Sequence, residues 1–105
     1  MRQFTVYRNK NPRTKGALPF LVDVQTDLLE DMQTRAVIPL GKGAALARKP
    51  IEHLMPAISF EGEDYLLLTP QLAGISRSDL GAVAGSVAEQ RQMILSAIDF
   101  LLTGF

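Results

Sequence analysis

Residues 20–40 read FLVDVQTDLLEDMQTRAVIPL, and this stretch decides the fold. Its two ends, Phe20–Val24 and Thr34–Leu40, are short and rich in β-branched and aliphatic residues, which is typical of strands. Pro39 cannot donate a hydrogen bond to a neighbouring strand, so we expect the second strand to lie at a sheet edge or to end near this residue.

The connection between these strands, Gln25–Gln33, carries Leu28 and Leu29 among acidic residues. Two interpretations stay open. The leucines pack beneath the sheet, or they form an exposed apolar contact ringed by acids, which suits a protein partner.

The rest of the first 80 residues predicts more strands and two loops. A glycine in the turn favours a hairpin, because Gly62 accepts backbone angles that other residues avoid. The predicted strands are Phe4–Tyr7, Ala57–Phe60, Tyr65–Thr69 (the last two around a turn at Glu61–Asp64) and a weak one within Leu72–Leu80; the loops are the basic segment Asn9–Gly16 and Gly41–Arg48, the latter with some helical turn.

The C-terminal segment predicts a helix. Ser86 and Glu89 have the spacing of a capping box, and apolar residues follow at helical spacing and also off that stripe. A helix that is apolar nearly all round is either covered by a second subunit or sunk in its own core. The stripe is Ile94, Ala97, Ile98 and Leu101, and the off-stripe residues are Met93, Leu95, Phe100 and Leu102.

The helix is expected to stop at Gly104 in a left-handed conformation. Phe105 then has two interpretations: it contacts Phe100 as part of the helix stop, or it serves a partner.

Length and composition describe a single domain, residues 1–105, with 47% hydrophobic residues and eleven acids against eleven bases. This balance argues against direct nucleic-acid binding, which needs several cations on the phosphates.

The chain has no cysteine, which excludes disulfides, thiolate zinc sites and cysteine nucleophiles. No apolar signal segment follows Met1 and no apolar run could span a membrane, so we expect a cytoplasmic protein without membrane contact.

Enzyme signals are scarce, and we expect no catalytic residue, no metal and no cofactor. His53 is the single histidine and has no cysteine or second histidine beside it. The acids of Glu61–Asp64 lie in a turn and lack the spacing of a calcium site. Gly41–Gly43 is too short for a phosphate-binding loop.

Several blocks resemble the CcdB family of toxins from toxin–antitoxin modules. The resemblance runs end to end and is most specific in the V-D-V-Q-[ST]-D and R-x-V-I-P-L patterns. It is carried by Gln3–Tyr7, Phe20–Asp27, Arg35–Leu40 and Ala97–Phe105. It implies a mainly β fold with one C-terminal α-helix: an SH3-like barrel of five antiparallel strands with a small inserted sheet, as in CcdB, Kid and MazF. It also implies a homodimer.

The family acts by binding the DNA gyrase A subunit and trapping the enzyme on cleaved DNA, and a CcdA-type antitoxin neutralises it. Carried over, the gyrase-binding positions are Leu28, Leu29, Asp99, Leu102, Thr103, Gly104 and Phe105. This choice favours the partner role of Phe105. Antitoxin tails are often acidic, so the candidate antitoxin contacts are the basic residues Arg8, Lys10, Arg13, Lys15, Lys42 and Arg48.

The chain departs from the family pattern at its end. The family closes with Trp-Gly-Ile, whereas this chain closes with Thr103, Gly104 and Phe105 and has no tryptophan. Loss of a tryptophan can remove more than about 2 kcal/mol of binding energy. One alternative to the gyrase interpretation is therefore a homologue that binds antitoxin without being toxic. The other is an endoribonuclease toxin of the same fold, like Kid and MazF, whose N-terminal pattern and basic RNA surface match this chain poorly.

Overall fold

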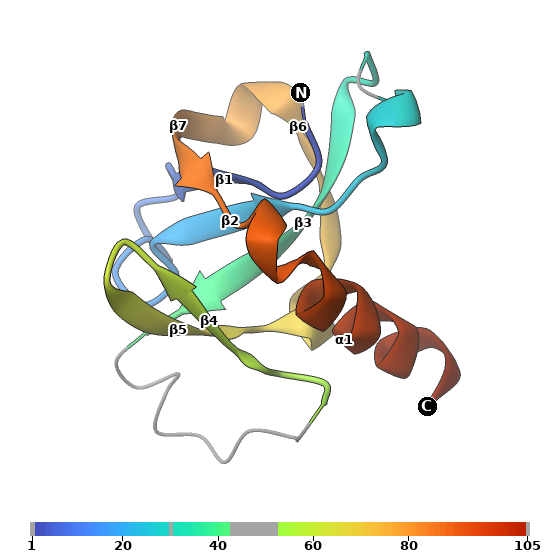
Figure 1. Ribbon diagram of the computed structural model, residues 1–105. Coiled ribbons are helices and arrows are strands. Elements are labelled where there is room, and N and C mark those ends of the chain that lie inside the picture. The colour runs from blue at the N-terminus through green and yellow to red at the C-terminus, as the bar shows by residue number, and fades with distance from the viewer. Residues whose placement is uncertain (1, 30, 43–52, 105) are drawn as a thin grey trace.

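The computed structural model describes residues 2–29, 31–42 and 53–104, and this part of the chain forms a curled antiparallel sheet with one α-helix (Figure 1). The strands are β1 (Thr5–Asn9), β2 (Phe20–Asp23), β3 (Thr34–Gly41), β4 (Ala57–Phe60), β5 (Glu63–Leu67), β6 (Ala73–Ser76) and β7 (Leu80–Ser86). Short 3₁₀ turns join them: η1 (Asp27–Leu29), η3 (Thr69–Gln71), η4 (Arg77–Asp79) and η5 (Ala88–Gln90), before α1 (Arg91–Thr103).

Strand β3 divides the sheet into a larger and a smaller part. On one side it pairs with β2; on the other, Thr34–Val37 pair with β6, and Leu40–Gly41 pair with β5. Five strands therefore run in the order β6-β3-β2-β1-β7, and the β4–β5 hairpin is a smaller attachment at the far end of β3. The predicted mainly β fold with one C-terminal helix is confirmed.

Of the two alternatives for Pro39, the sheet edge is wrong, because β3 lies inside the sheet and Pro39 is opposite Leu21 of β2. The other is confirmed, because β3 ends at Gly41, two residues after Pro39. The carbonyl of Pro39 accepts a hydrogen bond from the Leu68 N–H, 3.0 Å away, on the side that faces β5 and β6. The N–H and C=O groups of one strand residue point to the same side of the strand. The position of the N–H that Pro39 lacks therefore faces the gap between β5 and β6 and not β2. No ladder bond is needed there, and the proline is tolerated in an interior strand.

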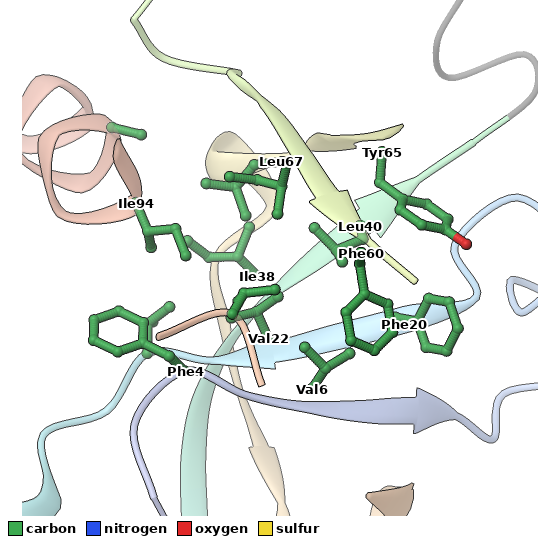
Figure 2. Close-up of a cluster of buried hydrophobic side chains, with 14 residues drawn as sticks. Phe4, Val6, Phe20, Val22, Ile38, Leu40, Phe60, Tyr65, Leu67 and Ile94 are labelled. Carbon is green, nitrogen blue, oxygen red and sulfur yellow. The ribbon is translucent and has the colours of Figure 1, made fainter. Parts of the chain in front are cut away.

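The core lies in the concave side of the sheet. Phe20 contacts the rings of Phe60 and Tyr65 edge-on, with centroid distances of 5.1 and 5.5 Å (Figure 2). Ile94 points from α1 into the same cluster and is fully buried. All four residues of β2 are buried because a second, smaller cluster, containing Leu21, covers its other face.

The capping box predicted at Ser86 is wrong. Ser86 ends β7, and its hydroxyl accepts a hydrogen bond from the Ala88 N–H (3.1 Å), so the chain first forms η5. The helix begins at Arg91 with no side-chain cap. The side-chain amide of Gln90 instead pairs with the backbone N–H and carbonyl of Ser59, at 3.0 and 2.7 Å, and fastens the edge of β4 to the helix start. No helix in the described residues is long and apolar enough to cross a membrane.

Strand β7 was not predicted, because its glycines and alanines carry no strand pattern. These glycines allow close packing: a side-chain carbon on Gly81 would lie 2.5 Å from the carbonyl oxygen of Arg8, and one on Gly85 would lie 2.9 Å from the Phe60 ring. The weak strand expected within Leu72–Leu80 is present as β6.

Two further boundaries differ from the prediction. Phe4 precedes β1 in a left-handed conformation (φ 70°), so this strand starts one residue later and runs on to Asn9. The hairpin turn is two residues long, Glu61 and Gly62, both with positive φ. The unusual backbone angle expected of Gly62 is confirmed. The predicted loop Gly41–Arg48 lies outside the described residues beyond Lys42.

Candidate functional site

The turn η1 exposes large apolar side chains. Leu28 is 91% exposed and Leu29 is 45% exposed, and Met32 follows at 50%. The interpretation in which the leucines pack beneath the sheet is therefore wrong. Leu28 and Leu29, called the η1 tip below, form an apolar projection beside the exposed Asp27 and Asp31, as a protein contact requires.

A buried ion pair lies beneath the η1 tip. The guanidinium of Arg35 donates from Nε and Nη2 to both carboxylate oxygens of Asp23, at 2.8 and 3.1 Å, and both side chains are fully buried. The third nitrogen, Nη1, donates to the carbonyl of Leu29 (2.9 Å). Asp23 and Arg35 both lie in the blocks that resemble the family, but the sequence pattern assigns neither of them a role. The sequence feature that points to their pairing is that each of two apolar strands carries one charged residue, acidic in β2 and basic in β3.

The outer side of η1 is tied to the N-terminal segment. The Asp27 carboxylate accepts hydrogen bonds from the Gln3 N–H (2.6 Å) and from Arg2 (3.3 Å). The Gln3 N–H, with a smaller contribution from the Arg2 charge, lowers the pKa of Asp27 below its usual value of 3.8. Neighbouring Thr26 accepts a hydrogen bond from the Leu28 N–H. The turn is thus fixed on both sides while its leucines face outward.

The C-terminal turn of α1 carries the second group of predicted contacts. Leu102 is 72% exposed, and Asp99, Thr103 and Gly104 are exposed beside it. These four residues are called the α1 end below. The Thr103 hydroxyl donates to the Asp99 carbonyl (2.7 Å).

Gly104 stops the helix as predicted. It has φ 78°, and its N–H donates to the carbonyl of Phe100 (2.8 Å). Both roles proposed for Phe105 concern a residue outside the described part of the chain.

The η1 tip and the α1 end do not form one patch in a single chain. Figure 1 shows η1 as the cyan turn between β2 and β3, well apart from the C-terminal end of α1, which extends beyond the sheet. The predicted gyrase-binding residues therefore form two separate surfaces on one chain.

The helix is not sunk in its own core. Ile94 and Ala97 are buried, but Met93 is 45% exposed beside a groove of about 870 Å³ that is also lined by His53 and Pro56. The alternative in which the core covers every side of the helix is therefore wrong. Apolar surface remains for a partner.

Five of the six basic candidates gather around one loop; Arg48 lies outside the described residues. Arg8, Lys10, Arg13, Lys15 and Lys42 are all exposed. The ammonium of Lys10 donates to a backbone carbonyl of η4 at 2.7 Å, and the backbone N–H of Lys42 binds the end of the loop at 2.9 Å.

This basic loop borders a groove of about 590 Å³. Leu18, Leu21 and Ile75 give the groove an apolar lining, and Asp79 adds one acid. An apolar lining beside several cations suits an amphipathic acidic peptide.

No group of three side chains of the kinds that ligate metals gathers within residues 2–29, 31–42 and 53–104. The exposed His53 lies near Phe100, with ring centroids 6.4 Å apart.

In a comparison with known families, the model for the CcdB protein matches residues 3–104, which is nearly the whole chain. The chain belongs to the CcdB toxin family. Among solved structures, this CcdB-family chain is similar to an endoribonuclease in complex with its cognate antitoxin from Mycobacterial species, with a TM-score of 0.77. The two share 16% sequence identity, and the match covers 97% of this chain and 94% of the other. Such a likeness shows the fold alone.

Proposed function

We propose that this chain is the toxin of a toxin–antitoxin pair and that it binds the DNA gyrase A subunit, trapping gyrase on cleaved DNA without breaking or forming a bond itself. The observation that carries the proposal is the exposure of Leu28 and Leu102, at 91% and 72%. Both occupy positions that the family uses for gyrase. Large apolar side chains that project into solvent beside charged residues suit the centre of a protein contact, which supports the proposal.

The proposal includes a homodimer. The η1 tip and the α1 end lie apart in one chain, and a two-fold axis at the C-terminal helices would place the two α1 ends together. The exposed Met93 and Leu102 supply apolar surface for such an arrangement. Sedimentation of the purified protein tests this step, and a monomer at micromolar concentration would contradict it.

Expression in a gyrase-bearing host tests the function directly. We expect growth arrest that a substitution in the dimerisation region of the gyrase A subunit relieves, and a supercoiling assay with purified gyrase should show inhibition and cleaved DNA. Removing Thr103–Phe105 should leave a folded dimer without toxicity. Toxicity that survives this truncation would contradict the assigned site.

The antitoxin is proposed to dock an acidic segment on the basic loop. Arg13→Glu combined with Lys15→Glu should weaken antitoxin binding, because two attractions become repulsions. Arg91→Glu, a single charge reversal on the exposed start of α1, is the control for charge reversal away from the basic loop and should bind antitoxin normally.

An endoribonuclease is the second candidate, favoured by the structural similarity to an endoribonuclease reported above. Incubating the purified protein with RNA separates the two. Specific cleavage that persists after repurification, with gyrase unaffected, would favour the ribonuclease. Harmless expression together with tight antitoxin binding would instead indicate a homologue that only sequesters antitoxin.

A further inference from the structure

The carbonyl oxygen of Leu29 accepts an unusual number of hydrogen bonds. Its donors are Nη1 of Arg35 (2.9 Å), Nε2 of Gln25 (3.2 Å) and the backbone N–H of Met32 (3.1 Å). A carbonyl has two lone pairs and is satisfied by two donors. Three donors converge here on the backbone of a turn whose neighbouring side chain, Leu28, is almost fully exposed.

Both side-chain donors are held at their other end by the sheet. Oε1 of Gln25 accepts the backbone N–H of Ala36 in β3 (3.0 Å), and Arg35 is fixed by its two bonds to Asp23. Each side chain therefore connects a strand to η1. The link to Leu29 is not needed to satisfy the Asp23 carboxylate or the Ala36 N–H. It gives the buried Nη1 of Arg35 an acceptor and, together with the bond from Gln25, it ties the turn to the sheet.

We infer that Gln25 and Arg35 are positioning residues that hold the η1 backbone so that Leu28 is presented to the protein partner in one fixed direction. A side chain on a pre-organised turn loses less conformational freedom on binding, and this raises affinity without a new contact. The inference deepens the proposed function and rests on it, because the partner is the gyrase A subunit.

Gln25→Glu tests the inference with the smallest change. The carboxylate keeps an acceptor for the Ala36 N–H but places an oxygen, in place of the N–H donor, against the Leu29 carbonyl. We expect faster amide hydrogen exchange at Leu29 and Met32, with unchanged exchange in β2 and β3. Binding of a gyrase A-subunit dimerisation fragment, measured by calorimetry, should weaken about two- to tenfold. Gln33→Glu, the same change on an exposed side chain of the same connection, should leave exchange and binding as in the wild type.

A double-mutant cycle with Leu28→Ala separates positioning from a general loss of stability. If Gln25 acts through Leu28, the substitution at Gln25 should have almost no further effect on binding in the Leu28→Ala background. Full additivity would overturn the inference, and so would unchanged exchange at the turn. Gln25→Ala, which removes both hydrogen bonds of the side chain without adding a charge, is the second variant if Gln25→Glu does not fold. The same exchange and cycle criteria apply to it.

Failure of the proposed function gives a different result. If the wild-type chain does not bind the gyrase fragment, the proposed partner is wrong, while faster exchange at η1 in Gln25→Glu would still support positioning of the turn.

Discussion

The two exposed surfaces of this chain are built in opposite ways. The η1 tip is held by the backbone N–H of Gln3 in the N-terminal segment and by side chains of β2 and β3, among them the buried Arg35–Asp23 pair. The α1 end is held by the helix backbone and by the burial of Ile94 and Ala97 nearer the helix start. One surface is fixed by a polar network beneath it, and the other by an apolar contact at a distance. Substitutions should therefore affect the two surfaces independently.

The largest expected effect is on the ion pair. Asp23→Ala leaves the Arg35 charge buried without its partner and should lower the free energy of unfolding by about 3–5 kcal/mol, measured by urea denaturation. The double substitution Asp23→Leu with Arg35→Met removes both charges and should recover most of this loss. In the recovered protein the η1 tip should exchange faster and the α1 end should be unchanged. Equal loosening of both surfaces would contradict the comparison.

The next largest effect on stability is expected where Ile94 packs from α1 into the core. Ile94→Ala should lower the free energy of unfolding by about 2–5 kcal/mol, because it leaves a cavity in the core. Circular dichroism should show loss of helix signal before the sheet unfolds, and hydrogen exchange at η1 should stay normal. Ser96→Ala, an exposed position on the same helix, serves as the control and should change little.

Exposed leucines should affect binding and not stability. Leu28→Ala and Leu102→Ala should each change the free energy of unfolding by less than about 0.5 kcal/mol and weaken gyrase binding by about 1–2 kcal/mol. Calorimetry and denaturation on the same samples separate the two quantities. Normal binding by both variants would remove the basis of the proposed site.

The sequence predicted the strands and the turn that local residue patterns determine. The strands β2 and β3 and the β4–β5 hairpin followed from β-branched runs and from Gly62, whose backbone angle is a local property. Strand β7 was missed because its small residues are explained only by neighbours distant in sequence, such as the Arg8 carbonyl that excludes a side chain at Gly81.

In the candidate site, too, the features that depend on neighbours distant in sequence were not predicted. The acidic surroundings singled out Leu28, and the helical pattern placed Leu102 off the apolar stripe; family resemblance then gave both a gyrase role. Which of the open interpretations holds depends on how the sheet curls, and the sequence did not decide it. The pairing of Asp23 with Arg35 needs the register of β2 on β3, in which Asp23 is opposite Val37, two residues from Arg35. Ser86 had capping-box spacing, yet its hydroxyl bonded the nearer Ala88 N–H.

A smaller effect is expected at the α1 end. Asp99 places a negative charge near the C-terminus of a helix, where the dipole is also negative and where the last turn carries no basic residue. Asp99→Asn should therefore raise the free energy of unfolding by about 0.3–1 kcal/mol. It should also weaken gyrase binding, which would mark the carboxylate as retained for the partner. Greater stability with unchanged binding would argue against a role for Asp99 in the contact.

The smallest effect is a pH dependence confined to the η1 tip. The folded-state pKa of Asp27 is lowered, chiefly by the Gln3 N–H and then by Arg2, so its contribution to stability is present above the unfolded value of 3.8 and is lost as the pH falls through the lower, folded value. Urea midpoints measured from pH 7 to pH 2.5 should show wild type and Asp27→Asn separated by a constant gap near neutrality that closes below about pH 4. Asp31→Asn makes the same charge change on an exposed neighbour and serves as the control for the loss of one negative charge. Equal urea midpoints for wild type and Asp27→Asn near neutrality would mean that the carboxylate does not tie the turn to the N-terminal segment. The η1 tip would then be held by Gln25 and Arg35 alone.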